Sequence, residues 1–230
     1  MIRERTYRAF THREAYLRIC CEAFGAVAEE IVQQRRILDD YIRRQPEFLT
    51  SFDPIDLLPG APPIAERMAW AARLAGVGPM AAVAGAMAQL AGQAGLAAGA
   101  PEAIIDNGGD IFIHAVEPVI IGLDAGTAKV GKQLAFLLEP NETPISICSS
   151  SGKMGHSISL GLCDLATIVA KDAALADAAA TAAGNLVKTV DDVDAALEQI
   201  SKIEGVDGIM LIKDDHVGMA GRLPKLVRTS

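Results

Sequence analysis

The sequence predicts an α+β fold in which Ala- and Gly-rich buried helices pack against mostly antiparallel sheets. Half of the 230 residues are apolar but only 4% are aromatic, so small side chains must fill much of the interior. Helix-like and strand-like segments are interleaved along the chain without regular βαβ units. Several short apolar runs are joined by tight turns, which is typical of antiparallel strands.

The N-terminal half alternates strand and helix patterns. Residues 7–24 are rich in β-formers and predict one or two strands, and residues 26–45 repeat apolar side chains at helical spacing. Four prolines between residues 52 and 63 predict a loop. Residues 65–74 follow as a short helix, which ends before Gly76.

A long stretch without charge covers residues 74–101 and is long enough to cross a bilayer. It consists mostly of Ala and Gly, and Pro79, Gln89 and Gln93 interrupt it. Small residues three and four positions apart favour a helix buried against other backbone. We therefore predict that residues 80–97 form the central buried helix and that Pro79 lies near its first turn.

The C-terminal half predicts more strands and two helices. Residues 104–136 predict three or four strands, residues 145–147 and 165–169 one strand each, and residues 206–219 a hairpin. The predicted helices are residues 172–187 and the amphipathic stretch 190–203. The chain is long enough for one domain of 230 residues, and a division into two intertwined lobes near residue 101 stays open.

Charge and cysteine content narrow the function classes. A net charge of −8 argues against a nucleic-acid partner, which would need a basic face. The four cysteines form no Cys-x-x-Cys pair, and the first residues lack the plan of a signal peptide. We expect a cytoplasmic protein without a membrane partner, and the high apolar content leaves a homo-oligomer open.

The segment Asp106-Asn107-Gly108-Gly109-Asp110 lies between two apolar runs. Such a pattern predicts a strand, a tight turn and a second strand, because glycine reaches positive φ without a Cβ clash. Two adjacent glycines also let a ligand approach the backbone closely. The local sequence leaves open whether this is a plain hairpin turn or part of a binding site.

Three other motifs resemble binding sites for phosphate or metal. The segment 126–132 nearly matches a phosphate-binding loop, but Gln133 follows where Ser or Thr would hold magnesium, so we reject that interpretation. Ser149, Ser150 and Ser151 precede a Gly-Lys pair and His156, a pattern that suits either a polar turn or a phosphate site.

Asp177 and Thr181 are four residues apart on a predicted helix, which places both oxygens on one face. Such a pair could serve a hard cation such as Mg²⁺, or Asp177 could simply face solvent.

In this order, the motifs resemble those of the ApbE superfamily. Its members include FAD:protein FMN transferases that were once linked to thiamine biosynthesis. The family's motifs correspond to Gly85-Ala-Met-Ala-Gln89-Leu90, Asp106–Asp110, Ser150-Ser-Gly152, His156 and Ala176-Asp177-Ala-Ala-Ala-Thr181. The resemblance covers residues 78–220 and is closest to a short, uncharacterised ApbE-like branch.

The resemblance implies an ApbE-like fold, FAD and Mg²⁺ as ligands, and a role for each motif. Asp177 and Thr181 would be metal ligands, and His156 would be the catalytic base. The residues that would line the dinucleotide site are Asn107, Gly108, Gly109, Asp110, Ser150, Ser151 and Gly152.

Two departures from the family pattern keep two functions open. Gln89 stands where the family has lysine, and Ser-Ile-Ser-Leu-Gly161 replaces the family's Asp-Pro-x-Thr-Gly loop after His156. The chain is therefore either a protein that binds or transfers a flavin or another phosphate-containing ligand with help from a metal, or a non-catalytic binding protein with the same fold. As an enzyme, it would be a Mg²⁺-dependent flavin transferase.

Overall fold

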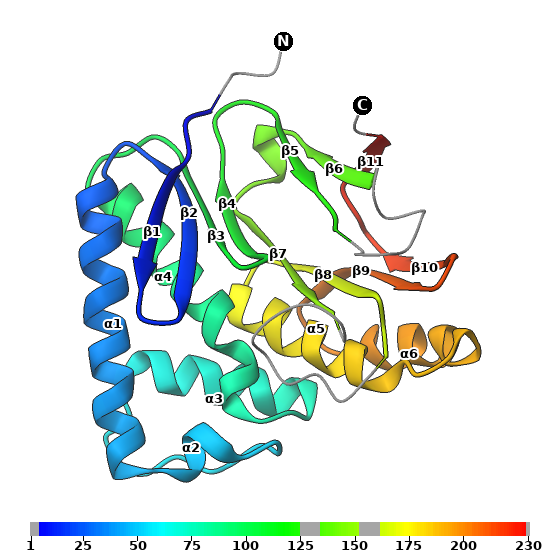
Figure 1. The fold of residues 1–230 in the computed structure, drawn as a ribbon, viewed down its shortest axis with the longest axis horizontal. Helices are drawn as coiled ribbons and strands as arrows, with labels where there is room; N and C mark the ends of the chain where they lie inside the picture. Colours follow the sequence, from blue (N-terminus) through cyan, green and yellow to red (C-terminus); the bar gives the residue numbers. More distant parts are fainter. Residues whose placement is uncertain (1–4, 125–133, 152–161, 229–230) are drawn as a thin grey trace.

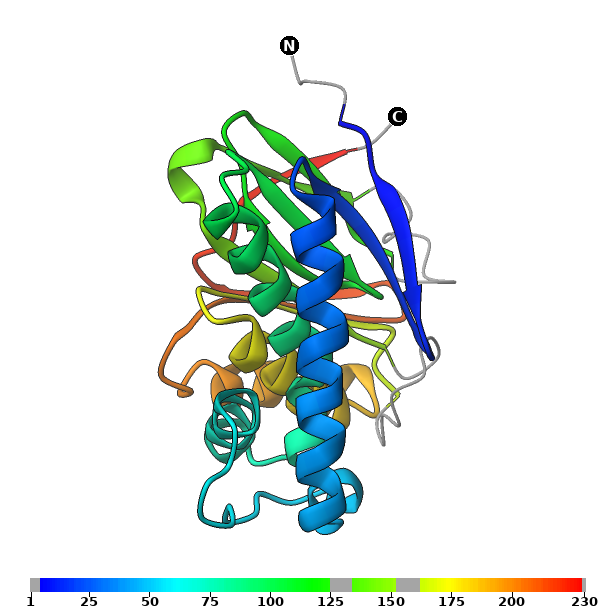
Figure 2. The same ribbon diagram turned by 90° about the vertical axis from the view of Figure 1, so that its left-hand side faces the viewer.

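The computed structural model describes residues 5–124, 134–151 and 162–228. Its helices lie on one side of a large sheet, and a small sheet lies on the other side (Figures 1 and 2). The α-helices are α1 (Phe24–Arg44), α2 (Glu47–Thr50), α3 (Pro63–Ala75), α4 (Val83–Ala97), α5 (Ala173–Leu186) and α6 (Val193–Ile200). The described residues also contain the 3₁₀ turns η1 (Pro79–Ala82), η3 (Pro140–Glu142) and η4 (Val190–Asp192).

Within the described residues, the large sheet has eight strands in the order β1-β2-β3-β4-β7-β8-β9-β10, and the small sheet has the order β11-β6-β5. Each strand pair in the described ranges is antiparallel. The first strands are β1 (Arg8–His12), β2 (Ala15–Cys21), β3 (Ala103–Asn107), β4 (Asp110–His114) and β5 (Val119–Gly122). The others are β6 (Leu134–Leu138), β7 (Ile145–Ser150), β8 (Leu165–Ala170), β9 (Val206–Lys213), β10 (His216–Gly221) and β11 (Lys225–Arg228). The predicted α+β class with mostly antiparallel sheets is confirmed.

Side chains alternate between the two faces of the large sheet, as the pleat requires. On β4, Ile111 and Ile113 belong to the core between the two sheets. Phe112 belongs to the core on the helix side, with Ile105 and Ala88. Asp110 shares the parity of Phe112 and therefore faces the helices.

Helix α4 packs closely against the sheet because its glycines leave no side chain between the helix backbone and the neighbouring residues. A Cβ on Gly92 would lie 2.3 Å from the ring of Phe112, and one on Gly95 would lie 2.6 Å from the Sγ of Cys21. Among the described residues, the stretch Pro79–Ala97 is the one helical run long and apolar enough to cross a membrane, and half of it is buried within the protein. One such helix is weak evidence for a span, and the close contacts of α4 are those of a core helix.

Several boundaries differ from the predictions. Strand β7 does not end at residue 147 but continues through Ser150, because Ser149 and Ser150 pair with Thr167 and Ala166 on β8. The predicted helix 190–203 is a 3₁₀ turn followed by the shorter α6. Strand β11 is absent from the predicted elements, and the phosphate-loop-like segment 126–132 lies outside the described residues.

Candidate functional site

The turn between β3 and β4 has the geometry of a two-residue hairpin loop. Asn107 pairs with Asp110 across the hairpin, and Gly108 and Gly109 have φ angles of 71° and 104°. Positive φ at both positions explains why two glycines stand here. The backbone N–H of Gly109 donates to a carboxylate oxygen of Asp106 at 2.9 Å, which fixes the turn. The hairpin prediction is therefore confirmed, and the turn places Asp110 at the start of β4.

Asp177 reaches the same region from α5. Its carboxylate accepts a 2.9 Å hydrogen bond from the backbone N–H of Gly85, in the first turn of α4, and a further backbone hydrogen bond from Ala84. Asp110 and Asp177 are only 8% and 9% exposed. The interpretation of Asp177 as a solvent-facing residue is wrong, because α5 packs its Ala-rich surface into the core on all sides.

Burial raises the pKa of both carboxyl groups, and the charge of Asp177 also acts on Asp110. Burial raises the pKa of Asp177 to about 7, although the N–H groups of Gly85 and Ala84 oppose the shift. Burial also raises the pKa of Asp110 well above its ordinary value, and the negative charge of Asp177 raises it further. A like charge nearby disfavours ionisation of a carboxyl group. A proton on one carboxyl group, or a cation bound between the two, would therefore stabilise the pair.

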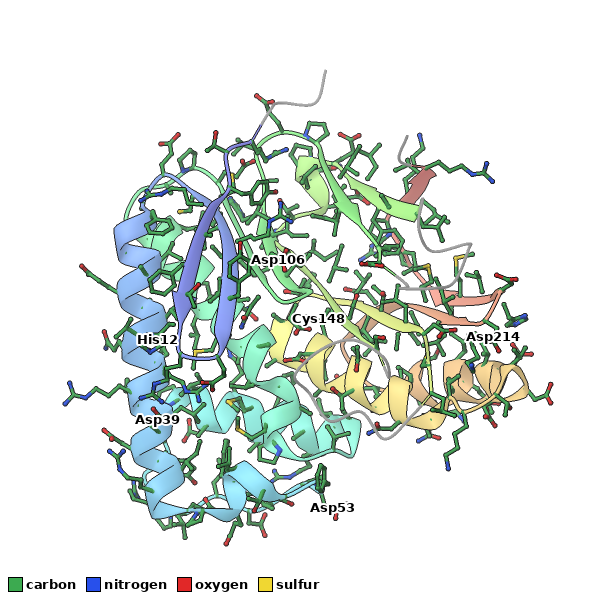
Figure 3. All side chains as sticks on the ribbon, viewed as in Figure 1. His12, Asp39, Asp53, Asp106, Cys148 and Asp214 are labelled. Carbon is green, nitrogen blue, oxygen red and sulfur yellow. The ribbon has the colours of Figure 1, made fainter. Side chains whose placement is uncertain are left out.

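Cys148 completes this cluster from β7, where it pairs directly with Asp110. Its thiol lies 3.5 Å from the carbonyl oxygen of Ala173 and next to the Asp110 carboxyl, whose pKa it lowers by hydrogen bonding. Burial and the two carboxylates raise the pKa of the Cys148 thiol well above its usual range. Figure 3 places Cys148 and Asp106 near the middle of the molecule, around the β3–β4–β7 part of the sheet.

Two buried oxygens in this region lack a hydrogen-bond partner among the described residues. They are Oδ1 of Asp110 and the hydroxyl of Ser150. An unpaired buried polar atom costs free energy, and such atoms are often completed by water, an ion or a ligand. The unpaired oxygens come from neighbouring strands, β4 and β7.

A cavity of about 320 Å³ lies between the large and the small sheet. The Gly108-Gly109 turn and Ser149, Ser150 and Ser151 line one part of it, and Ile111, Ile121, Leu123, Ile147 and Leu165 supply apolar walls. Its other lining residues include Asp106 and Asp124 and no Lys or Arg of the described ranges. The cavity is within the range of small-molecule sites, at the lower end.

The other predicted site residues lie as follows. Asn107 donates from its side-chain amide to the carbonyl oxygen of Ala84 at 3.2 Å, which ties the turn to α4. Thr181 is half-buried and lies one helical turn after Asp177. Gly152 and His156 lie outside the described residues, so both roles remain predictions.

Three contacts in and around the cluster are not evident from the sequence. The surroundings of Cys148 along the chain indicate only a packed thiol, but it contacts the Asp110 carboxyl because the β4–β7 pairing brings them together. Gly85 allows α4 to approach α5: its Cβ would lie 2.1 Å from the carbonyl oxygen of Ala173. Gln89 accepts a 2.7 Å hydrogen bond from the N–H of Ala173. The last two contacts bridge more than 80 residues of sequence, and no local pattern reveals them.

Comparisons with known proteins identify the family of this chain. A family model described as "AbpE bacteria" matches residues 4–218. The chain belongs to this ApbE-like family. A UPF0280 protein of Archaeoglobus fulgidus is 42% identical over 226 residues, covering 94% of this chain and 92% of that protein. A UPF0280 protein of Methanocaldococcus jannaschii is 40% identical over 219 residues, covering 93% of this chain and 88% of that protein.

Solved structures of ApbE proteins share the fold of this ApbE-like chain. The ApbE protein of Thermotoga maritima superposes with a TM-score of 0.57 at 14% identity, covering 98% of this chain and 97% of that one. The flavin transferase ApbE of Vibrio cholerae gives a TM-score of 0.52 at 12% identity, with 94% and 96% covered. The predicted family and fold are thus confirmed.

The donor set of the cluster fits a hard cation better than a soft one. In the described ranges, no three side chains of His, Cys, Asp or Glu gather in a metal-binding group. The oxygens available are the carboxylates of Asp110 and Asp177 and the hydroxyl of Thr181. Mg²⁺ prefers oxygen donors and usually keeps water or substrate phosphate in its remaining positions. The unpaired Oδ1 of Asp110 is consistent with such an ion.

Proposed function

We propose that this ApbE-like chain binds a pyrophosphate-bearing flavin nucleotide together with a divalent cation at the Asp110–Asp177 cluster. The observation that carries the proposal is the buried pair of carboxyl groups, one of which has an unpaired oxygen. Two neighbouring buried carboxylates repel each other unless a proton or a cation compensates them. Asp110, Asp177 and Thr181 would hold the cation.

The cavity adjoins the cluster at the Gly108-Gly109 turn and Ser150, although Asp110, Asp177 and Thr181 do not line it. The cavity lining contains two carboxylates and no Lys or Arg of the described ranges, so a pyrophosphate would meet negative charge there. A bound divalent cation would neutralise the phosphate oxygens. The N–H groups of the Gly108-Gly109 turn and the hydroxyl of Ser150 would donate to the ligand. The apolar residues between the sheets would contact a ring of the flavin nucleotide.

Gln89 favours a second candidate, binding without transfer of FMN. The side chain at this position is neutral, and its oxygen accepts the N–H of Ala173. It therefore supplies no positive charge to a phosphate. In this second candidate the chain holds the nucleotide and leaves its pyrophosphate intact.

Calorimetric titration of MgCl₂ into the metal-free protein tests the cation site. We expect saturable binding to the parent chain, loss of binding in Asp177→Asn, and retained binding in the matched control Asp172→Asn. Asp172 caps the same helix, and Asn caps a helix as well as Asp does. Equal binding by Asp177→Asn and the parent would reject the proposed cation ligand.

Incubation of the protein with FAD, Mg²⁺ and a threonine-containing peptide separates the two candidates. Binding alone leaves FAD intact on chromatography. Release of AMP, together with flavin attached to the peptide, would instead show transfer, in which the threonine oxygen bonds to the FMN phosphorus and the bond to AMP breaks.

A further inference from the structure

The outer face of α1 and the edge strand β1 form one side of the molecule (Figure 2). Strand β1 is the last strand of the large sheet, so one of its edges has no partner strand within the described residues. A groove of about 780 Å³ lies along this side and is lined by Phe10 of β1 and by α1 residues between Ala28 and Asp40. We call this surface the α1–β1 face.

Two opposite charges lie along the groove, two helical turns apart. Glu29 and Arg36 are both exposed, and neither forms an ion pair or a hydrogen bond with any residue of the described ranges. Val32, which is 42% exposed, and Gln33 lie halfway between them. The face therefore has Val32 and Gln33 at its centre, with the negative charge of Glu29 on one side and the positive charge of Arg36 on the other. Asp40 also lines the groove beyond Arg36, and it forms an ion pair with Arg43.

This charge pattern is complementary to itself. A two-fold axis between Val32 and Gln33 would run two α1 helices antiparallel. It would place Glu29 against Arg36 of the partner subunit, and it would do so twice because a two-fold contact repeats each pair. The same axis would set Ala28 against Ile37 of the partner subunit, so a small and a large apolar side chain would meet just outside each charge pair.

We propose that two copies of this chain form a two-fold dimer through the α1–β1 face. The same two-fold axis would also allow the edge strand β1 to pair with its copy in the partner subunit. Phe10 is the middle residue of β1 and lines the groove beside Val32. Two β1 strands centred on Phe10 would pair antiparallel and continue the large sheet across the dimer. An exposed strand edge is a ready template for such pairing.

Contacts within the single chain hold the α1–β1 face rigid. Asp39 of α1 forms ion pairs with Arg13 of the β1–β2 turn and with Arg35, and Arg35 also contacts Glu14 at 2.5 Å. Figure 3 shows Asp39 and His12 on this same side of the molecule. Phe10 packs edge-on against Phe24 at 6.2 Å between ring centroids. Rigid surfaces lose less entropy on association than mobile ones do.

Sedimentation velocity over a wide range of protein concentration tests the dimer. We expect a species of twice 24.1 kDa, and single charge reversals, Glu29→Arg or Arg36→Glu, should weaken dimerisation by about tenfold or more because each places like charges together twice. The double variant E29R/R36E restores both pairs in reversed sense and should recover the dimer. Glu66→Arg, on the exposed side of α3, is the matched control and should dimerise like the parent.

Three outcomes would overturn the proposal. One is a monomer at every concentration. Another is a dimer that tolerates both single reversals, which would place the interface elsewhere. The third is a double variant that remains monomeric although its thermal melt matches the parent's. Circular dichroism of each variant separates a lost interface from a lost fold.

Discussion

The backbone N–H of Gly85 donates to the carboxylate of Asp177 at 2.9 Å, joining the start of α4 to the middle of α5. This contact requires glycine at position 85. A Cβ there would lie 2.1 Å from the carbonyl oxygen of Ala173 and 2.9 Å from the Cβ of Asp177. Helix α5, which carries the candidate cation ligand Asp177, is therefore in close backbone contact with α4.

The substitution Gly85→Ala should lower the free energy of unfolding by about 1–3 kcal/mol, because the added methyl group forces the two helices apart. Gly25→Ala is a matched control, since Gly25 also lies in the first turn of a helix but has no atom within 4 Å of the place that a Cβ would take. It should leave stability unchanged or raise it by up to about 1 kcal/mol. Urea unfolding measures both, and equal effects would show that the contact at Gly85 is not tight.

The stability of the metal-free protein should fall as pH rises. The pKa of Asp177 is raised in the folded state from 3.8 to about 7, so its protonated form favours folding. This contribution is fully present below about pH 4 and is lost as pH rises through about 7. Each kcal/mol lost lowers the melting temperature by about 2–4 °C in a chain of this size.

Asp177→Asn should flatten this part of the pH profile, because Asn keeps the shape of the side chain and does not titrate. Thermal melts of parent and variant between about pH 4 and pH 8, in the presence of EDTA, make the comparison. Parallel profiles for the two proteins would contradict a raised pKa at Asp177.

Gln89→Leu should cost about 1–3 kcal/mol of stability, because the N–H of Ala173 would lose its 2.7 Å partner in a buried place. Gln199→Leu, on the exposed side of α6, is the control and should change stability by less than about 0.5 kcal/mol. Chemical unfolding of both variants checks this. If Gln89→Leu is as stable as the control, Gln89 does not support the start of α5.

The local parts of the fold and of the site could be predicted from the sequence. Helical spacing predicts α1, and Asn107-Gly108-Gly109 predicts the hairpin because both glycines need positive φ. The i, i+4 spacing of Asp177 and Thr181 predicts that they share one helix face.

Non-local contacts could not be predicted in this way. Asp110 and Asp177 are brought together by the packing of α5 against the sheet, and Cys148 joins them through the β4–β7 pairing. The burial of Asp177 does not follow from its Ala-rich neighbours, since these suit an exposed and a buried helix equally. Strand β7 extends through Ser150 because β8 pairs with it, which overrides the turn preference of a serine run.

Binding of FAD in the presence and absence of Mg²⁺ tests the central claim most directly. Quenching of flavin fluorescence should be saturable with Mg²⁺, and EDTA or the substitution Asp177→Asn should abolish it, while Asp172→Asn should bind like the parent. If no saturable change occurs with Mg²⁺, or if binding is equally tight in EDTA, the Asp110–Asp177 cluster is not a cation-dependent nucleotide site.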